Sequence, residues 1–384
     1  MYNGIKRITK VKGSVHRCPR ISVPDSCSQP PTILDLFAGA GGTALGFRNA
    51  GFRILGAVEM EPSAAETYEK NLNIRVRVAD LRDLPPAEFR QSLMIERGDL
   101  DVLVGCPPCQ GFSRMRNISG ANDERNSLVI RYLEFVDKFR PKYAFFENVR
   151  GMVSSLHGRI FYDMLKSALR DLGYGVAERA VNAADYGVPQ HRHRAIVIAG
   201  RDGLVPPFPW PTHGNPRLDV VKEGFRKPWL TVRDAIERYQ QLGSDEKPNH
   251  VPAQTGSVVT EFIQKVPKNG GSRADVPRIY WLACHRQHKG HRDVYGRASW
   301  NRPGNTLTGG CTNPSKGRFV HPEEDRGFTF REAAALQGFP DWFVFHGAKL
   351  AEQIGNAVPP PLAEAFAEVL YHQLQSRSTH YRSN

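Results

Sequence analysis

Short apolar runs separated by amphipathic stretches fill the first two hundred residues of the chain. The runs lie at 32–37, 54–58, 102–104, 143–146 and 195–199. Each is too short for a helix and is bounded by glycine, proline or polar residues, which is typical of buried strands. Helical spacing occupies the intervals, most clearly at 64–72 and 128–139. Strands that alternate with helices in this way predict an α/β fold built on a doubly wound parallel sheet.

The regular alternation fades after residue 204. Residues 205–330 are rich in proline and basic side chains, and we interpret them as a smaller domain inserted into the first. Helical patterning returns at 331–336 and at 362–374, where three prolines precede the second helix. Residues 1–30 have no apolar periodicity and are interpreted as a flexible arm. The predicted parts are therefore the arm 1–30, a first domain 31–204, the insert 205–330 and a return to the first domain over 331–384.

The net charge is unevenly distributed along the chain. It carries 52 Lys and Arg against 39 Asp and Glu, a formal net charge of +13. Residues 1–30 hold six basic and one acidic side chain, and residues 201–330 hold 20 basic and 13 acidic ones. Excess positive charge on an arm and one insert suggests two elements that face a polyanion such as nucleic acid, although solvated loops would have the same composition.

Two negative observations limit the class of protein. No apolar run approaches the roughly 18 residues that a membrane span needs, and the first residues lack the apolar stretch of a signal peptide. The six cysteines are too sparse over 384 residues for a disulfide framework. We therefore expect a soluble protein in a reducing, intracellular compartment, in which any important cysteine acts as a free thiol.

A glycine-rich turn follows the first predicted strand. Gly39 and Gly41 allow the backbone to pass close to a bound nucleotide, and Glu59 at the end of the next strand is placed to hold ribose hydroxyls. The pattern indicates a nucleoside cofactor, yet the turn alone does not separate a nicotinamide dinucleotide from S-adenosylmethionine. A turn without any ligand is a third interpretation.

A cysteine loop follows the strand at 102–104. Two prolines precede Cys109 and fix the local backbone, so that its thiol can be aimed at a substrate from the carboxyl end of the sheet. The favoured interpretation is a nucleophile. A redox pair or half of a zinc site formed with Cys106 is an alternative, as is a buried, inert cysteine.

Charged side chains also lie at the ends of the next two predicted strands. Glu147 directly follows an apolar run, where a partly desolvated carboxyl group is suited to donate a proton to a ring nitrogen. Arg192 and Arg194 stand two residues apart at the start of the strand at 195–199, and alternation would place them on one face. Two guanidinium groups there suit a base carbonyl and a phosphate. Helix capping for the glutamate and a solvated strand end for the arginines are the alternatives.

Taken together and in order, these segments resemble the DNA (cytosine-5)-methyltransferase family of the bacterial restriction-modification type. The resemblance rests on DLFAGAGG at 35–42, PCQGFS at 108–113, ENV at 147–149, QHRHR at 190–194, REAAALQGFP at 331–340 and QIGNAV at 353–358. It covers residues 32–374 apart from the variable insert. It implies a Rossmann-like S-adenosylmethionine-dependent sheet, with the insert as the target recognition domain.

The resemblance implies a role for each matching residue. It makes Cys109, Glu147 and Arg194 catalytic. It assigns Phe37, Gly39, Gly41, Glu59, Met60, Asp80, Pro108, Asn356 and Val358 to the S-adenosylmethionine site. It assigns Gln110, Ser113, Arg192, Thr306 and Leu307 to the DNA, with Arg192 on the backbone or supporting Glu147. Met60 departs from the aromatic residue often found there. No metal is implied, and we do not interpret Cys284, His285, His288 and His291 as a zinc site.

The implied reaction transfers a methyl group from S-adenosylmethionine to carbon 5 of a cytosine in a specific duplex DNA sequence, through a covalent Cys109 adduct to a flipped-out base. The implied setting is a bacterial cytoplasm, on the nucleoid, as a monomer on DNA. A cognate restriction endonuclease would act on the same site without stable binding, and no membrane is involved. The alternatives are a transfer-RNA cytosine-5 methyltransferase, a catalytically silent DNA-binding relative, and a nicotinamide oxidoreductase.

Overall fold

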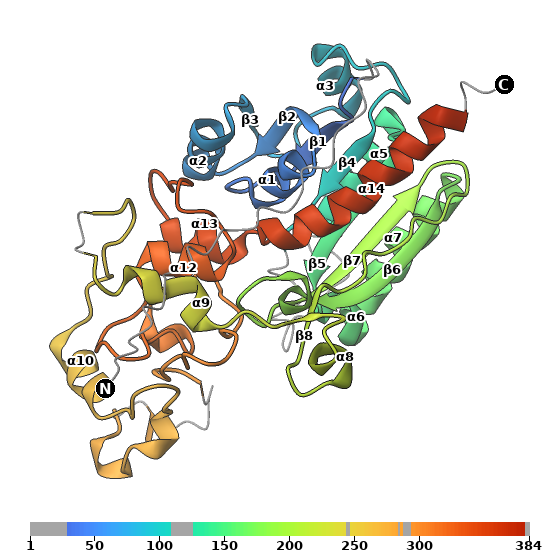
Figure 1. Cartoon of the computed structure of the whole chain (residues 1–384). Coiled ribbons are helices and arrows are strands. Elements are labelled where there is room, and N and C mark those ends of the chain that lie inside the picture. Colours follow the sequence, from blue (N-terminus) through green and yellow to red (C-terminus); the bar gives the residue numbers. More distant parts are fainter. Residues whose placement is uncertain (1–28, 109–125, 243–245, 283–284, 287–292, 381–384) are drawn as a thin grey trace, which may run out of the picture. The chain divides into compact units, whose positions relative to one another are not determined.

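The computed structural model describes residues 29–108, 126–242, 246–282, 285–286 and 293–380 (Figure 1). The chain divides into two units, Met1–Pro30 and Pro31–Asn384, and all that follows concerns the second. Within the described ranges, no helix combines the length and the apolar character that crossing a membrane requires.

Seven strands of the described residues form one mixed sheet in the order β3-β2-β1-β4-β5-β7-β6. Their bounds are β1 Thr32–Leu36, β2 Arg53–Glu59, β3 Val76–Val78, β4 Val102–Gly105, β5 Tyr143–Val149, β6 Gly175–Asn182 and β7 His193–Gly200. The five predicted strands are confirmed. The sheet is not wholly parallel as predicted, because β7 runs antiparallel to both β5 and β6. Only residues 183–192 join β6 to β7, and so short a connection suits an antiparallel pair better than a parallel crossover.

Helices cover both faces of this sheet. The bounds of the described α-helices are α1 Gly42–Asn49, α2 Pro62–Leu72, α3 Pro86–Ser92, α5 Asn126–Phe139, α6 Gly151–Ser154, α7 Leu156–Asp171, α8 Asp219–Lys222, α9 Val232–Ile236, α10 Ser257–Gln264, α12 Phe330–Leu336, α13 Leu350–Asn356 and α14 Pro360–His380. Of these, α1 and α14 pack on one face and α5 and α7 on the other. Two further strands, β8 His213–Gly214 and β9 Lys227–Pro228, form a small separate sheet. The helices predicted at 64–72, 128–139, 331–336 and 362–374 lie inside α2, α5, α12 and α14.

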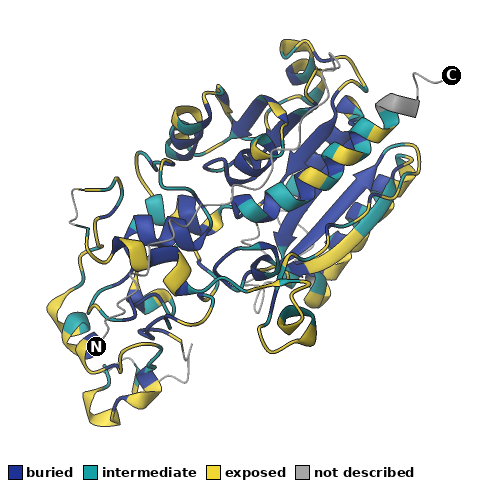
Figure 2. Ribbon diagram, viewed as in Figure 1, coloured by how far each residue is buried: buried dark blue, intermediate teal, exposed yellow. Residues whose placement is uncertain are grey.

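The two faces of the sheet are the two halves of the core. Val102 and Val104 of β4 pack in one cluster with α1 and α14, whereas Leu103 packs in the other with α5 and α7. Because alternate side chains enter opposite clusters and both clusters are buried, the central strands are continuously apolar. Figure 2 shows these central strands as buried throughout. The functional groups can therefore project only from the strand ends.

The segment between β7 and α12 has a different architecture. It contains short helices, two-residue strands and long irregular stretches, with a small buried cluster of its own that includes Phe262, Ile263 and Tyr295. Other side chains of the segment, such as Trp300 and Phe319, pack with the main core. The predicted fading of regular alternation is confirmed, and the exact division into domains stays a prediction.

The last helix returns to the first. A Cβ on Gly46 of α1 would lie 2.5 Å from the carbonyl oxygen of Pro360 and 2.6 Å from the Cβ of Ala363. Glycine at this position therefore lets α14 pack directly on the backbone of α1. This contact brings the residues before α14 to the glycine turn.

Candidate active site

The turn between β1 and α1 has an unusual backbone. Phe37, Gly39 and Gly41 all have positive φ, at 57°, 54° and 94°. A Cβ on Gly41 would lie 2.9 Å from side-chain carbons of both Tyr68 and Leu72, so only glycine fits there. The predicted tight turn is thus present, and it presents backbone rather than side chains to the space beside it.

Glu59 is tied to this turn from the end of β2. Its Oε2 accepts a hydrogen bond from the Gly39 N–H at 2.8 Å, and its Oε1 accepts one from the Glu61 N–H at 2.9 Å. Burial raises the pKa of Glu59, while these backbone hydrogen bonds act in the opposite direction. A carboxylate fixed in this way fits the ribose hydroxyls of a nucleoside, so the donor set agrees with the predicted S-adenosylmethionine site.

The other predicted cofactor residues lie nearby on the same elements. Met60 follows β2 and is 61% exposed, which leaves its thioether free to pack on an aromatic ring. Asp80 follows β3 and pairs with Arg82 at 2.6 Å, and hydrogen bonding to that arginine lowers the pKa of Asp80. The Asp80 carboxylate is therefore an acceptor for an amine.

Residues from the end of the chain complete this side of the site. A Cβ on Gly42 would lie only 2.2 Å from the carbonyl oxygen of Val358, so the segment after α13 lies against the glycine turn. Val358 is buried and Asn356 is exposed. The structure thus brings together predicted cofactor residues that are more than 300 positions apart in the sequence.

The cysteine loop begins at the end of β4, beside β1. Pro107 and Pro108 are described, whereas Cys109, Gln110 and Ser113 lie outside the described residues. Asn148, which follows Glu147 in β5, donates from Nδ2 to the Pro107 carbonyl oxygen at 3.3 Å. The start of the loop is therefore bonded to the strand that carries Glu147.

Cys106 has a different character from the predicted nucleophile. Its Sγ lies 3.8 Å from Thr43 Oγ1. Although the residue keeps some solvent-accessible surface, desolvation of the thiol raises the pKa of Cys106 well above its usual value, and the nearby carboxyl groups of Glu147 and Asp35 add to this. Cys106 therefore remains a neutral thiol at physiological pH, which does not suit a nucleophile.

Glu147 and Arg194 form a buried ion pair across β5 and β7. Arg194 Nε lies 2.7 Å from Glu147 Oε1, and the two side chains are only 10% and 9% exposed. The N–H is not aligned on that oxygen, and Glu147 Oε1 has no hydrogen-bond partner among the described residues. A carboxyl group held in place by charge, with one oxygen still able to bond, can exchange a proton with a ring nitrogen.

Arg192 points elsewhere. Its guanidinium donates to the carbonyl oxygens of Leu307, Gly355 and Ala357 at 2.9–3.0 Å, and the side chain is 1% exposed. Arg192 and Arg194 therefore have different partners, because Arg194 pairs with Glu147. Arg192 thus connects the strand end to two distant segments rather than facing solvent.

Thr306 and Leu307 are held by the same strand end. Thr306 Oγ1 donates to the His191 carbonyl oxygen at 2.5 Å, and the Leu307 N–H donates to Gln190 Oε1 at 3.0 Å. Gln190 also donates to the Leu336 carbonyl oxygen at 2.9 Å. The insert is therefore fixed beside Arg192 and Arg194.

Sequence reasoning did not assign functions to Asn148, Gln190 or Gln337. All three are buried amides that bond the segments of the site together, and Gln337 Nε2 donates to the Ala357 carbonyl oxygen at 2.5 Å. The sequence did contain a signal for them, because each is an amide side chain in or beside a motif at the end of an apolar run. An amide buried at such a position requires a hydrogen-bond partner.

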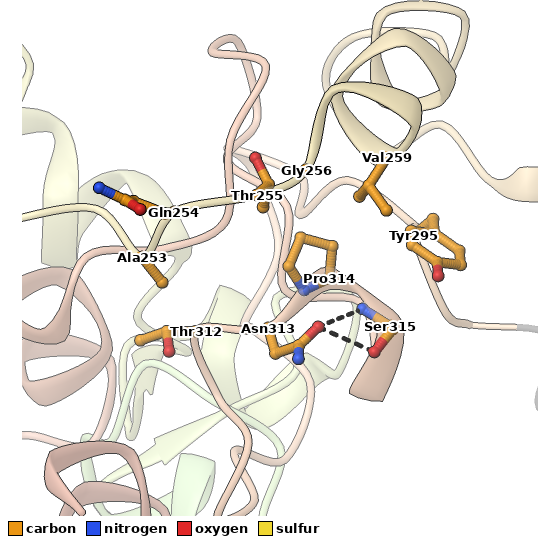
Figure 3. Close-up of a pocket in the computed structure, with 10 residues that line it drawn as sticks. All are labelled: Ala253, Gln254, Thr255, Gly256, Val259, Tyr295, Thr312, Asn313, Pro314 and Ser315. Carbon is orange, nitrogen blue, oxygen red and sulfur yellow. Dashed lines mark hydrogen bonds between the residues drawn. The ribbon is translucent and has the colours of Figure 1, made fainter.

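Farther out, the insert contains a pocket of about 290 Å³ (Figure 3). Gln254, Thr255, Tyr295, Thr312 and Asn313 are among the residues that line it. Asn313 Oδ1 accepts hydrogen bonds from the Ser315 N–H at 2.9 Å and hydroxyl at 2.8 Å. The residues of the strand-end site do not line this pocket. Within the described residues, no group of three His, Cys, Asp or Glu is placed to hold a metal ion.

Comparison with known proteins identifies the family. A family model described as C-5 cytosine-specific DNA methylase matches residues 31–372. The chain belongs to this family. The methyltransferase is 36% identical over 346 residues to the Type II methyltransferase M1.HphI of Haemophilus parahaemolyticus, covering 88% of this chain and 86% of that one. It is 32% identical over 380 residues to the Type II methyltransferase M.XorII of Xanthomonas oryzae pv. oryzae, covering 90% and 86%.

Solved structures agree with the fold. A putative DNA modification methyltransferase encoded within a prophage (E. coli) has a TM-score of 0.61 and 26% identity to this chain, and the match covers 90% of this chain and 99% of that one. The S. pombe Dnmt2 methyltransferase has a TM-score of 0.60 at 18% identity, over the same shares of the two chains, which shows the fold alone. The predicted family, the α/β fold and the methylation of cytosine carbon 5 in DNA are confirmed, with S-adenosylmethionine as the methyl donor.

Proposed function

We propose that the methyltransferase is the modification enzyme of a Type II restriction-modification system, acting on one specific duplex sequence. The relatives described above carry Type II names, and the matches cover most of both chains. In this proposal the enzyme works as a monomer on DNA, and a cognate endonuclease competes for the same site without forming a stable complex with it.

The single observation that carries the proposed mechanism is the buried Glu147–Arg194 pair beside the cysteine loop. Cytosine carbon 5 is a weak nucleophile, so its electron density must first be raised. We assign Cys109 as the thiolate that adds to carbon 6 while Glu147 donates a proton to N3. Carbon 5 of the resulting enamine would then take the methyl group from S-adenosylmethionine, which would leave as the neutral thioether. A base removes the carbon 5 proton, Glu147 takes back the N3 proton, and the thiolate leaves.

The chain's own residues organise these steps. Arg194 holds Glu147 in position and offers its remaining N–H groups to the pyrimidine O2. Asn148 fixes the backbone before Cys109 through the Pro107 carbonyl oxygen. Gln110 and Ser113 would follow the cysteine toward the DNA. Because this chemistry needs access to a ring face, the cytosine must leave the stack, at a cost of about a few kcal/mol that DNA contacts offset.

S-adenosylmethionine, when bound, supplies an electrophilic methyl group. The residues that would hold it are the turn of Phe37, Gly39 and Gly41, together with Glu59, Met60, Asp80, Pro108, Asn356 and Val358. Glu59 already accepts two backbone hydrogen bonds beside the turn, so its carboxylate need not reorganise to receive ribose hydroxyls.

Thr306 and Leu307 lie at the junction between the insert and the strand ends. Both are bonded to residues 190–192, which leaves the adjoining residues of the insert to meet the duplex. We therefore place Thr306 and Leu307 next to the flipped base and assign most of the sequence preference to residues of the insert that precede them.

The decisive experiment is covalent trapping on duplex DNA that carries 5-fluorocytosine. Fluorine cannot leave carbon 5 as a proton does, so the thiolate stays attached after methyl transfer. We expect a methyl-donor-dependent adduct with the wild type and none with Cys109→Ser. The matched control is Cys106→Ser, which should keep the adduct because Cys106 is a neutral thiol.

Glu147→Gln should slow adduct formation by about 10²- to 10⁴-fold, because the amide cannot donate the same proton. An adduct that persists in Cys109→Ser and disappears in Cys106→Ser would overturn the assignment of the nucleophile. An adduct that forms on transfer RNA but on no duplex would overturn the proposed substrate.

A further inference from the structure

A short basic loop projects from the end of the sheet that carries the site. We call residues 213–228 the basic loop. It consists of β8 and β9, which pair in parallel, with α8 between them. In Figure 1, α8 extends away from the sheet on the side of α6, the helix that follows Glu147 and β5.

The base of the loop is anchored to the segment that carries the arginines of the site. Asp185 accepts a hydrogen bond from the Thr212 N–H at 3.0 Å through its carbonyl oxygen, and one from Trp229 Nε1 at 2.8 Å through its carboxylate. The Trp229 ring packs edge-on against His191 at 4.8 Å between centroids. Both ends of the loop are thus fixed within a few residues of Arg192 and Arg194.

The rest of the loop is exposed and positively charged. It holds four basic and two acidic side chains. Lys222 is paired with Asp219 at 3.1 Å, but Arg217 and Lys227 are exposed and form no ion pair with any residue in the described part of the chain. Phe225, between α8 and β9, is 77% exposed. The loop therefore offers two unneutralised cations and an aromatic ring to solvent.

We propose that the basic loop binds the DNA backbone on one flank of the flipped cytosine, with Arg217 and Lys227 on phosphates and Phe225 against the sugars. A cytosine that reaches Glu147 brings its neighbouring phosphates to the same end of the sheet, where the anchored loop stands. This inference rests on the proposed function, because it assumes that the target base enters the strand-end site. It assigns to the loop affinity and orientation, and no reading of sequence.

The test is the salt dependence of duplex binding by the whole enzyme. Each phosphate contact contributes about 0.9 to the slope of log affinity against log salt, so Arg217→Ala/Lys227→Ala should flatten that slope by about 1.8. The ratio of wild-type to variant affinity for the duplex should then fall about tenfold between 50 and 200 mM salt. The matched control is Arg53→Ala/Arg170→Ala, two exposed arginines at the start of β2 and the end of α7, which should leave the slope unchanged.

A second measurement places the contact. Shortening the duplex on one flank of the target cytosine should remove the difference between wild type and the loop variant, whereas shortening the other flank should preserve it. Equal slopes for the loop variant, the control and the wild type would overturn the proposal. A failure of the loop proposal is distinguished from a failure of the proposed function by the 5-fluorocytosine adduct. If the wild type and the control variant form no adduct on duplex DNA, the proposed function is wrong; if they form it, only the loop proposal is wrong.

Discussion

The sheet and the segment over 205–330 satisfy their buried backbone groups in different ways. In the sheet, each strand bonds to the next through a continuous ladder. In the segment, side chains add to the backbone bonds, and the fully buried Arg297 alone donates to the carbonyl oxygens of Val266, His321, Glu324 and Ile263 at 2.7–3.1 Å. It also pairs with Asp325.

This difference shows how an irregular chain can be folded without a ladder. A guanidinium carries five N–H donors in a fixed plane, so one arginine replaces several strand-to-strand hydrogen bonds. Arg192 acts in the same way at the junction, where it bonds to Leu307, Gly355 and Ala357. In the sheet, the backbone is stabilised by many equivalent hydrogen bonds between strands. In the segment, a single arginine side chain makes several of the hydrogen bonds that stabilise the backbone.

Replacing Arg297 with methionine should have the largest effect. The change leaves four buried carbonyl oxygens without this donor and Asp325 with Lys268 alone, and we expect a loss of about 3–5 kcal/mol. Hydrogen exchange should accelerate in residues 263–266 and 321–324 while β4 and β5 stay protected. Val104→Ala in β4 is the matched core substitution, and it should lower global stability without this local opening.

Equal acceleration of exchange in the sheet and in the segment of the Arg297→Met protein would remove the distinction between the two regions. Arg297→Lys extends the test, because lysine keeps the charge opposite Asp325 but cannot reach all four carbonyl oxygens.

Replacing Arg192 with lysine should have an intermediate effect, at the junction. The loss of the planar guanidinium should lower the free energy of unfolding by about 1–3 kcal/mol, because the Leu307 and Gly355 carbonyl oxygens both lose their donor. Because these residues adjoin the insert and the cofactor side, we expect the apparent affinities for DNA and for S-adenosylmethionine both to fall, by about tenfold. Binding titrations with each ligand alone measure this, and a change confined to one ligand would show that Arg192 does not couple the two sides.

Asp35 offers the most specific test, inside the sheet. The residue is 1% exposed, its Oδ2 has no hydrogen-bond partner in the described part of the chain, and burial raises the pKa of Asp35 to about 8, with the Glu59 charge adding to the rise. A raised pKa in the folded state favours the protonated form, so the folded protein loses stability as pH rises from about 4 toward 8. Asp35→Asn should not show this loss.

The stability of Asp35→Asn relative to the wild type should therefore increase with pH over that window, by up to about 1.4 kcal/mol per pH unit, and level off above pH 8. Denaturant titrations at a series of pH values measure it. A pH-independent difference would mean that Asp35 is ionised in the folded protein, and that even the sheet tolerates an unpartnered buried charge.

Much of the fold could be predicted because the central strands are buried on both faces and so are continuously apolar. The edge strands β3 and β6 were missed, since β3 has three residues and β6 is largely solvent-accessible and contains the exposed, charged Glu178 and Arg179. Glu147 stood out as a carboxyl group directly after an apolar run. The two arginines at 192 and 194 could not be told apart, because Glu147 and the carbonyl oxygens of Leu307, Gly355 and Ala357, which distinguish them, are brought near only by the fold.

The burial of Arg297 in the insert could not be predicted from the sequence, for a related reason. Arg297 is a charged residue in a stretch of mixed apolar and polar side chains that has no clear helical or strand period. Its burial depends on carbonyl groups up to 34 positions away. Sequence reasoning finds groups that follow a strand, and it does not find groups whose partners are brought near only by the folded insert.

The close packing of Val358 on Gly42, and of Pro360 and Ala363 on Gly46, also sets the order in which the enzyme becomes competent during synthesis. The first strand and its glycine turn emerge from the ribosome more than 300 residues before the segment that closes over them. Contacts of such long sequence separation form late, because a long loop must be closed first. A growing chain can therefore carry the cysteine loop and Glu147 for most of its translation while it still lacks the segment that we propose closes the S-adenosylmethionine site.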